Sequence, residues 1–273
     1  MIKQYSSAGD RIVHLVLTAN PKRPETEKAR ARIAEIAAAM GFSYTLYNGE
    51  ETDVPPNTDA FVVIGGDGSL IRVAHVTCKR GLPLIGVHCG RVGFLTELNE
   101  SEIEMALSRL RAGDYAVSTR VMLDVRVNNG EPVPCLNDVL VFKHSFSGVT
   151  QLDFLVDANP VGTLFGDGVV VATPTGATGY SLSAGGPIVA DGLDAMLITP
   201  ICPHTLHIRP IVASINSTIT IRLSEACFVA ADGDRIAELK KGDLVTVTRS
   251  SYVTKILTFG DRNPFRLISE KLS

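Results

Sequence analysis

The chain has 273 residues, of which 45% are hydrophobic, 20% charged and 6% aromatic. This composition is typical of a globular protein and excludes collagen, coiled coil and wholesale disorder. Lys and Arg number 26 against 29 Asp and Glu, which gives a net charge of −3 and argues against a nucleic-acid or membrane-surface partner. Five cysteines without a Cys-x-x-Cys pair predict a cytoplasmic protein without a disulfide framework. No apolar stretch is long enough to span a membrane.

The first 112 residues alternate between predicted strands and helices. Apolar runs predict strands, and apolar positions on one helical face after Pro24 predict a helix that stops at Gly41. This alternating order predicts an α/β domain with an open parallel sheet. The expected strands cover residues 11–17, 60–64 and 84–87, and the expected helices begin at Pro24, after Gly68 and at the capping box Ser101-Glu102-Ile103-Glu104.

From residue 113 to 252 the sequence becomes rich in short β-type segments. Val121, Leu123, Val125 and Val127 alternate with Met122, Asp124 and Arg126, as expected of a strand. Many such segments separated by turn residues predict a layered, β-rich second domain. The expected strands cover residues 121–127, 139–142, 152–156, 168–172, 195–200, 219–223, 227–231 and 244–248.

A glycine-rich corner, Gly65-Gly66-Asp67-Gly68-Ser69, lies between a predicted parallel strand and a predicted helix. Open α/β sheets bind ligands at this edge, and a helix start offers free N–H groups to a phosphate. A carboxylate at Asp67 suits metal binding or proton acceptance rather than a plain phosphate cradle, which suggests phosphoryl transfer. The alternative is a tight turn with Asp67 as a helix cap. No P-loop is present, and Ile71 stands where a dinucleotide fingerprint needs glycine.

A second candidate is the stretch from Gly166 to Pro187, which mixes threonine, serine and tyrosine hydroxyls with glycines. Small hydroxyls and bare backbone suit a polar, flat ligand such as a nucleotide; a long decorated turn is the alternative. Asn137-Asp138 and Asp232-Gly233-Asp234, taken alone, predict turns beside strands.

Together these segments resemble the NAD kinase family. The resemblance covers residues 60–235 in the family's order, from the Gly-Gly-Asp-Gly corner through the segment Gly86–Glu97 and Asn137-Asp138. It continues through Gly166-Asp167-Gly168, Thr173-Pro174-Thr175-Gly176 to Gly185-Gly186-Pro187, and Pro200–Leu206 with Arg209-Pro210. Where the family usually has Asn-Glu, Ser and Ala, this chain has Asn137-Asp138, Ala177 and Gly179.

The resemblance implies an NAD kinase: a phosphotransferase that moves the ATP γ-phosphate to the adenosine ribose 2′-hydroxyl of NAD, making NADP. It implies a divalent metal ion, Mg²⁺ by preference, and a homodimer or homotetramer. The metal ligands stay open: Asp67 with substrate phosphates is one candidate set, and metal binding by Asp67 is the alternative to proton acceptance. The tail, residues 253–273, is expected to return to the first domain. Asp67 is the expected catalytic proton acceptor. The expected nucleotide-binding residues are Gly66, Gly68, Arg72, Asn137, Asp138, Asp167, Thr178, Gly179, Tyr180, Ser181, Leu182, Ser183 and Asp234.

Two other functions remain open from the residues. Lipid and sugar kinases share the Gly-Gly-Asp-Gly element, although no basic amphipathic helix supports a membrane-bound substrate. A non-catalytic NADP(H)-binding protein is expected to lose Asp67, which is present here. Inorganic polyphosphate is an alternative phosphate donor to ATP. Because Asn is nearly isosteric with Asp, an Asp67→Asn protein is expected to lose turnover while its melting temperature barely moves.

Overall fold

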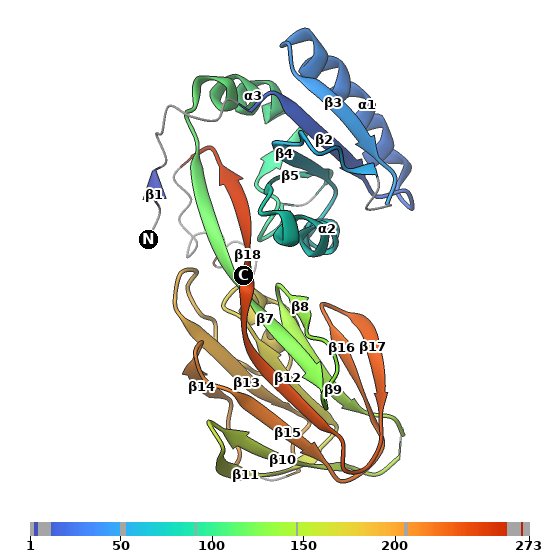
Figure 1. Ribbon diagram of the computed structural model, residues 1–273, viewed down its shortest axis with the longest axis vertical. Helices are drawn as coiled ribbons and strands as arrows, with labels where there is room; N and C mark the ends of the chain where they lie inside the picture. The colour runs from blue at the N-terminus through green and yellow to red at the C-terminus, as the bar shows by residue number, and fades with distance from the viewer. Residues whose placement is uncertain are drawn as a thin grey trace. The chain divides into compact units, whose positions relative to one another are not determined.

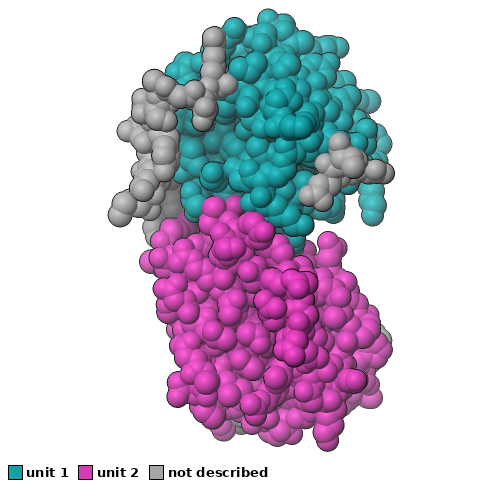
Figure 2. Space-filling view, in the orientation of Figure 1, with its two compact units in different colours: residues 1–119, 254–273 teal, residues 120–253 magenta. Residues whose placement is uncertain are grey.

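The computed structural model describes residues 3–4, 12–49, 53–90, 92–145, 147–204, 207–260 and 269. It divides into two compact units, residues 1–119 with 254–273 and residues 120–253 (Figures 1 and 2). Two long strands, β7 (Ala116–Val127) and β18 (Leu244–Thr258), pair with each other and run from one unit into the other. Lys255 and Ile256 of β18 pair with β5 (Pro83–His88) of the first unit. The return of the whole tail, residues 253–273, stays a prediction, since residues 261–273 other than 269 lie outside the described part.

The first unit contains a parallel sheet in the order β5-β4-β2-β3, and β5 also pairs in parallel with the end of β18. The chain leaves β2 toward β3 on one side and leaves β4 toward β5 on the other. The carboxyl ends of β2 and β4 therefore form a topological switch point, where sheets of this kind bind ligands. These strands are β2 (His14–Ala19), β3 (Ser43–Tyr47), β4 (Ala60–Ile64) and β5 (Pro83–His88), with short β1 (Lys3–Gln4) and β6 (Leu98–Asn99).

Three helices cover this sheet: α1 (Pro24–Ala39), α2 (Asp67–Arg80) and α3 (Ile103–Ala112). Pro24 opens α1 as predicted, and Gly81 and Gly113 end α2 and α3 in the left-handed conformation, with φ of 66° and 73°. The predicted capping box is wrong by two residues. Asn99 caps a 3₁₀ turn, Glu100–Glu102, while the Glu102 carboxylate accepts from the Asn99 N–H.

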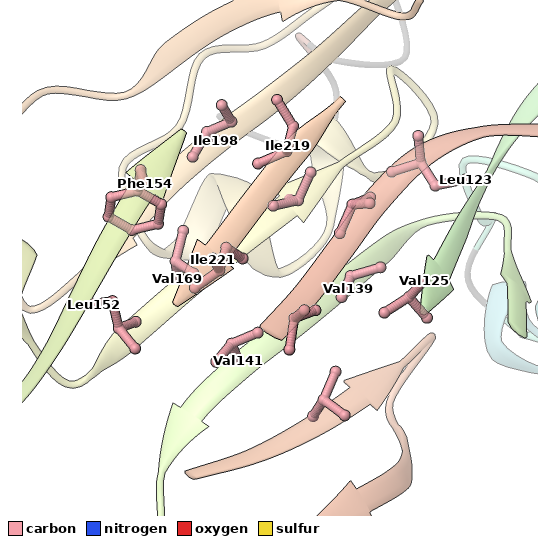
Figure 3. Close-up of a cluster of buried hydrophobic side chains, with 14 of the residues drawn as sticks. Leu123, Val125, Val139, Val141, Leu152, Phe154, Val169, Ile198, Ile219 and Ile221 are labelled. Carbon is pink, nitrogen blue, oxygen red and sulfur yellow. The ribbon is translucent and has the colours of Figure 1, made fainter. Parts of the chain in front are cut away.

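The second unit is built from antiparallel strands in two sheets. One sheet has the order β14-β13-β12-β9-β16-β17, and the other contains β11-β10-β15-β18 with β7 and β8. Their shared core is hydrophobic and includes Leu123, Val141, Phe154, Val169 and Ile221 (Figure 3). The remaining strands are β8 (Val133–Cys135), β9 (Asp138–Lys143), β10 (Thr150–Val156), β11 (Asn159–Gly166), β12 (Gly168–Ala172), β13 (Ala195–Ile201), β14 (Ile211–Ser214), β15 (Ile219–Leu223), β16 (Cys227–Ala231) and β17 (Asp234–Leu239).

The predicted α/β domain with a parallel sheet and β-rich second domain are confirmed. Two short helices, a 3₁₀ turn at Gly176–Thr178 and α4 (Tyr180–Ser183), lie between β12 and β13 and were not predicted. Among the described residues, no helix is long and apolar enough to cross a membrane.

Candidate functional site

The glycine-rich corner lies at the switch point of the first unit. Gly65 follows β4, its N–H binds the Val87 carbonyl oxygen at 2.8 Å, and α2 begins at Asp67. A Cβ atom added to Gly66 or Gly68 would meet nothing within 4 Å. The fold itself therefore gives no reason for glycine at these two positions. Bare backbone in open space beside a helix start is what an approaching phosphate requires.

The Asp67 carboxylate is held by the loop that follows β5. It accepts hydrogen bonds from the backbone N–H groups of Phe94, Leu95 and Thr96 at 2.7, 2.9 and 3.1 Å, and from the Thr96 hydroxyl at 3.2 Å. The helix-cap alternative is wrong, because no side chain caps α2. Asp67 instead anchors this loop.

The same contacts show which oxygen of the Asp67 carboxylate can accept a further partner. Among the described residues, Oδ1 accepts from Leu95 and Thr96, whereas Oδ2 accepts from Phe94 alone. A Cβ atom on Gly93 would lie 1.9 Å from Oδ1, so the close approach of this loop requires glycine. The arrangement leaves Oδ2 as the oxygen with room for another partner.

In the second unit, Asn137 and Asp138 are locked against the loop after β12. The Thr173 N–H binds the Asn137 carbonyl oxygen at 2.8 Å, and the Thr173 hydroxyl binds the Leu136 carbonyl oxygen at 2.6 Å. A Cβ atom on Gly176 would lie 2.1 Å from the Asn137 carbonyl oxygen. The backbones of Gly176 and Asn137 are therefore in direct contact, and this packing, rather than a turn, requires glycine at position 176.

The Asn137 and Asp138 side chains in this segment both carry buried polar atoms. The Asn137 Oδ1 atom is buried and has no hydrogen-bond partner among the described residues. Asp138 is only 9% exposed, and burial, followed by the negative charge of Asp232, raises the pKa of its carboxyl from 3.8 to about 7. Buried polar groups are normally hydrogen-bonded, so an exception points to a missing partner.

Asp232 is the functional residue that sequence reasoning missed. Its carboxylate accepts from the N–H groups of Leu136, Asn137 and Asp138 at 2.7, 2.7 and 3.2 Å. The pattern Asp-Gly-Asp predicts only a hairpin turn, which it forms between β16 and β17. No signal in the sequence connects this turn to a segment more than ninety residues earlier.

The other predicted residues of the second unit occupy different environments. Ser181 is fully buried and its hydroxyl contacts the Thr199 hydroxyl at 2.9 Å. Asp167 pairs with Lys143 at 2.7 Å. Tyr180 is exposed, and burial of its hydroxyl, then the charges of Cys202, Asp167 and Asp138, raise its pKa. Thr178, Gly179 and Leu182 are half-buried, and Ser183 and Asp234 are exposed, as is Arg72 in the first unit.

The structure thus brings the predicted residues together in two groups, one in each unit. Gly66, Asp67 and Gly68 form the first group, to which the unpredicted segment 93–96 is added. Asn137, Asp138 and the loop after β12 form the second group, to which Asp232 is added. The acid that contacts Asn137 and Asp138 is Asp232; Asp234 stays a predicted binding position.

Comparisons with known proteins cover both units. Residues 17–115 match the ATP-NAD kinase N-terminal domain and residues 136–259 match the ATP-NAD kinase C-terminal domain. The chain is 42% identical to an NAD kinase of Geotalea daltonii, over 83% of this chain and 82% of that protein. It is 36% identical to an NAD kinase of Thermoanaerobacter sp., over 87% of this chain and 86% of that protein.

Two solved structures share the fold. Yeast NADH kinase, solved with NADH, superposes with a TM-score of 0.89 at 23% identity, covering 96% of this chain and 88% of its own. An NAD kinase from Archaeoglobus fulgidus, solved with ATP, superposes with a TM-score of 0.78 at 27% identity, covering 95% and 98%. With matched domains across both units and relatives well above 30% identity, the chain belongs to the NAD kinase family, enzymes that phosphorylate NAD with ATP.

Proposed function

We propose that this protein transfers the γ-phosphate of ATP to the adenosine ribose 2′-hydroxyl of NAD, making NADP. The observation that supports this most directly is the buried pair Asn137 and Asp138: the Asn137 Oδ1 atom has no hydrogen-bond partner among the described residues, and the Asp138 carboxyl is buried with a raised pKa. Ribose hydroxyls and the adenine amino group are donors that would satisfy them. Family membership sets aside the lipid and sugar kinase alternatives.

Asp67 is the proposed proton acceptor. As the 2′-hydroxyl oxygen bonds to the γ-phosphorus, the bond from that phosphorus to the β-bridging oxygen breaks and ADP leaves. The hydroxyl proton passes to Asp67 Oδ2, the carboxylate oxygen that accepts a hydrogen bond from Phe94 alone among the described residues. The Phe94–Thr96 N–H groups keep the carboxylate in place during this step. Phosphoryl transfer needs alignment and charge neutralisation more than covalent help.

The bare backbone at Gly66 and Gly68, with the start of α2, is the proposed contact for ATP phosphates. Arg72 lies exposed one turn further along α2 and is proposed to contribute positive charge. In the second unit, Asp167, Thr178, Gly179, Tyr180, Leu182 and Ser183 are proposed to contact the dinucleotide. Ser181 is proposed to hold this loop through Thr199, and Asp234 remains a predicted binding position.

A divalent metal ion, Mg²⁺ by preference, is implied by the family. Among the described residues, no group of three or more His, Cys, Asp or Glu side chains can form a metal cage. Mg²⁺ does not need one, because it is commonly bound by one or two carboxylates together with substrate phosphates. Asp67 fits that role as the alternative to accepting the proton, and the bound ion would neutralise phosphate charge.

A coupled assay with purified protein tests the proposed reaction. We expect NADP to form from NAD, ATP and MgCl₂, and EDTA to abolish its formation. Replacing ATP by inorganic polyphosphate in the same assay identifies the donor. Phosphorylation of diacylglycerol or fructose 6-phosphate without any NADP formation would contradict the proposal. A cytoplasmic homodimer or homotetramer remains a prediction, which light scattering and cell fractionation test.

A further inference from the structure

The acid Asp232 occupies a tight turn whose geometry points its carboxylate at another segment. Asp232 and Gly233 have φ of 50° and 87°, and the flanking residues Ala231 and Asp234 pair directly. These are the features of a type I′ hairpin turn, in which Asn-Gly and Asp-Gly are the preferred sequences. The turn therefore does not need the carboxylate for its own conformation.

That carboxylate instead organises the backbone of Leu136, Asn137 and Asp138. It accepts all three of their N–H groups, and the Asp232 N–H in turn donates to the Asp138 carbonyl oxygen at 3.0 Å. Hydrogen bonds to an ionised acceptor are stronger than neutral ones. Asp232 thus fixes the peptide planes that direct the Asn137 and Asp138 side chains.

Asp232 also determines the electrostatic surroundings of Asp138. The titratable groups near Asp138 are Asp232, Cys135 on β8, Tyr180 on α4 and, through its effect on Cys135, Asp124 on β7. Burial, followed by neighbouring negative charges, raises the pKa values of Cys135 and Tyr180, so both are neutral near pH 7. Among the described residues, Asp232 is the charged group that opposes ionisation of Asp138.

We propose that Asp232 is a positioning residue for the acceptor dinucleotide: it holds Asn137 and Asp138 in their binding geometry, and its negative charge moves the pH dependence of acceptor affinity toward higher pH. This inference rests on the proposed role of Asp138 in gripping NAD. An ionised Asp138 accepts hydrogen bonds from the ligand better than a neutral one, and Asp232 resists that ionisation. Affinity for NAD therefore rises as the pH passes through neutrality.

The test is the NAD dissociation constant of the full-length protein, measured by titration calorimetry from about pH 6 to about pH 9. In Asp232→Asn the turn survives, because Asn-Gly favours it, but one amide oxygen replaces a charged acceptor of three N–H groups. We expect affinity at the alkaline end to fall about tenfold or more. We also expect the midpoint of the pH dependence to move toward acid, because the opposing charge is gone.

Two further variants separate the possible outcomes. Asp243→Asn removes a turn carboxylate that accepts from the Lys240 N–H and from Asn128, and it should leave affinity and midpoint unchanged. Asp138→Asn should abolish the pH dependence. If Asp138→Asn binds NAD like the wild type, the proposed function of Asp138 fails. If it does not, but Asp232→Asn keeps the wild-type midpoint or the wild-type affinity, the role of Asp232 is overturned.

Discussion

At the residue scale, the contacts of Asp67 change what its replacement should do. The amide introduced by Asp67→Asn has a single acceptor oxygen, whereas the native carboxylate accepts three N–H groups and a hydroxyl through two oxygens. Losing a hydrogen bond to a charged group costs about 1.5–3 kcal/mol. We therefore expect Asp67→Asn to lower the melting temperature by several degrees, contrary to the expectation from isosterism, and kcat to fall about 10²–10⁴-fold.

Thr96→Val separates the two roles of Asp67. It removes one hydrogen bond to the carboxylate, at 3.2 Å, and leaves the acid itself in place. If Asp67 accepts the proton, this variant should keep most of the wild-type kcat while losing about 1 kcal/mol of stability. A kcat as low as that of Asp67→Asn, measured in the same NADP assay, would show that Asp67 acts only by holding the loop.

The buried Asp138 is expected to lower the stability of the folded protein at neutral pH while it supports the binding of NAD. Its carboxyl has a pKa of about 7 in the folded protein, raised from 3.8 by burial and then by Asp232. A raised acid pKa means that stability is fully present below about pH 4 and is lost progressively until about pH 7. Asp138→Asn cannot ionise, so at neutral pH it should be more stable than the wild type by on the order of 2–4 kcal/mol.

Urea unfolding of both proteins at several pH values checks this prediction. The stability difference should be small near pH 4, grow until about pH 7 and then level off. A difference that does not change with pH would contradict the raised pKa. The same variant should bind NAD more weakly, because the fold keeps Asp138 for its ligand rather than for its own stability.

Some residues of the candidate site could be predicted from the sequence, and Asp232 could not. Gly66, Asp67, Asn137 and Asp138 belong to short local patterns, so they could be singled out from the sequence. The contact of Asp232 with Asn137 depends on the pairing of β16 with β9. The pairing of strands so far apart in the chain leaves no local pattern in the sequence. The sequence therefore predicts Asp232 only as part of a turn.

At the element scale, buried strands were predictable and edge strands were not. All five residues of β4 and of β12 are buried, and continuous apolar runs mark such strands. Strands β3 and β11 lie at the two ends of one strand order and are largely exposed, so their sequences lack a clear apolar pattern. Helices α1 and α3 were predictable because Pro24 and Gly41 mark the two ends of α1 and Gly113 marks the end of α3, whereas the short helices after β12 carry no such signal.

The start of α2 allows a sharp test of the phosphate contact. A Cβ atom on Gly68 would meet nothing within 4 Å, and Ala is about 1 kcal/mol better than Gly inside a helix. Gly68→Ala should therefore keep or raise the melting temperature while NADP formation falls, because only the ligand needs the bare backbone. Wild-type turnover in this variant would remove Gly68 from the site. Gly93→Ala provides the contrast, since its Cβ clashes with Asp67 and stability should fall.

At the scale of the whole molecule, each of the two units buries a large hydrophobic core of its own. One includes Leu15, Ile33, Val62 and Leu107 of the first unit, and the other includes Leu123, Val141 and Ile221 of the second. Chains with more than one core commonly depart from two-state unfolding. A ligand that binds only one folded unit stabilises that unit by mass action. NAD should therefore raise the stability of the second unit, which carries Asn137 and Asp138, more than that of the first.

Hydrogen exchange in increasing urea, followed by mass spectrometry, measures the two units separately. Peptides from β2 and β4 report on the first core, and peptides from β9 and β12 report on the second. At an NAD concentration about a hundred times its dissociation constant, the second set should gain about 2.7 kcal/mol of protection. Asp138→Asn should lose that gain while keeping its own higher stability. Equal gains in both sets, or a single shared transition with and without NAD, would show that the two cores unfold as one.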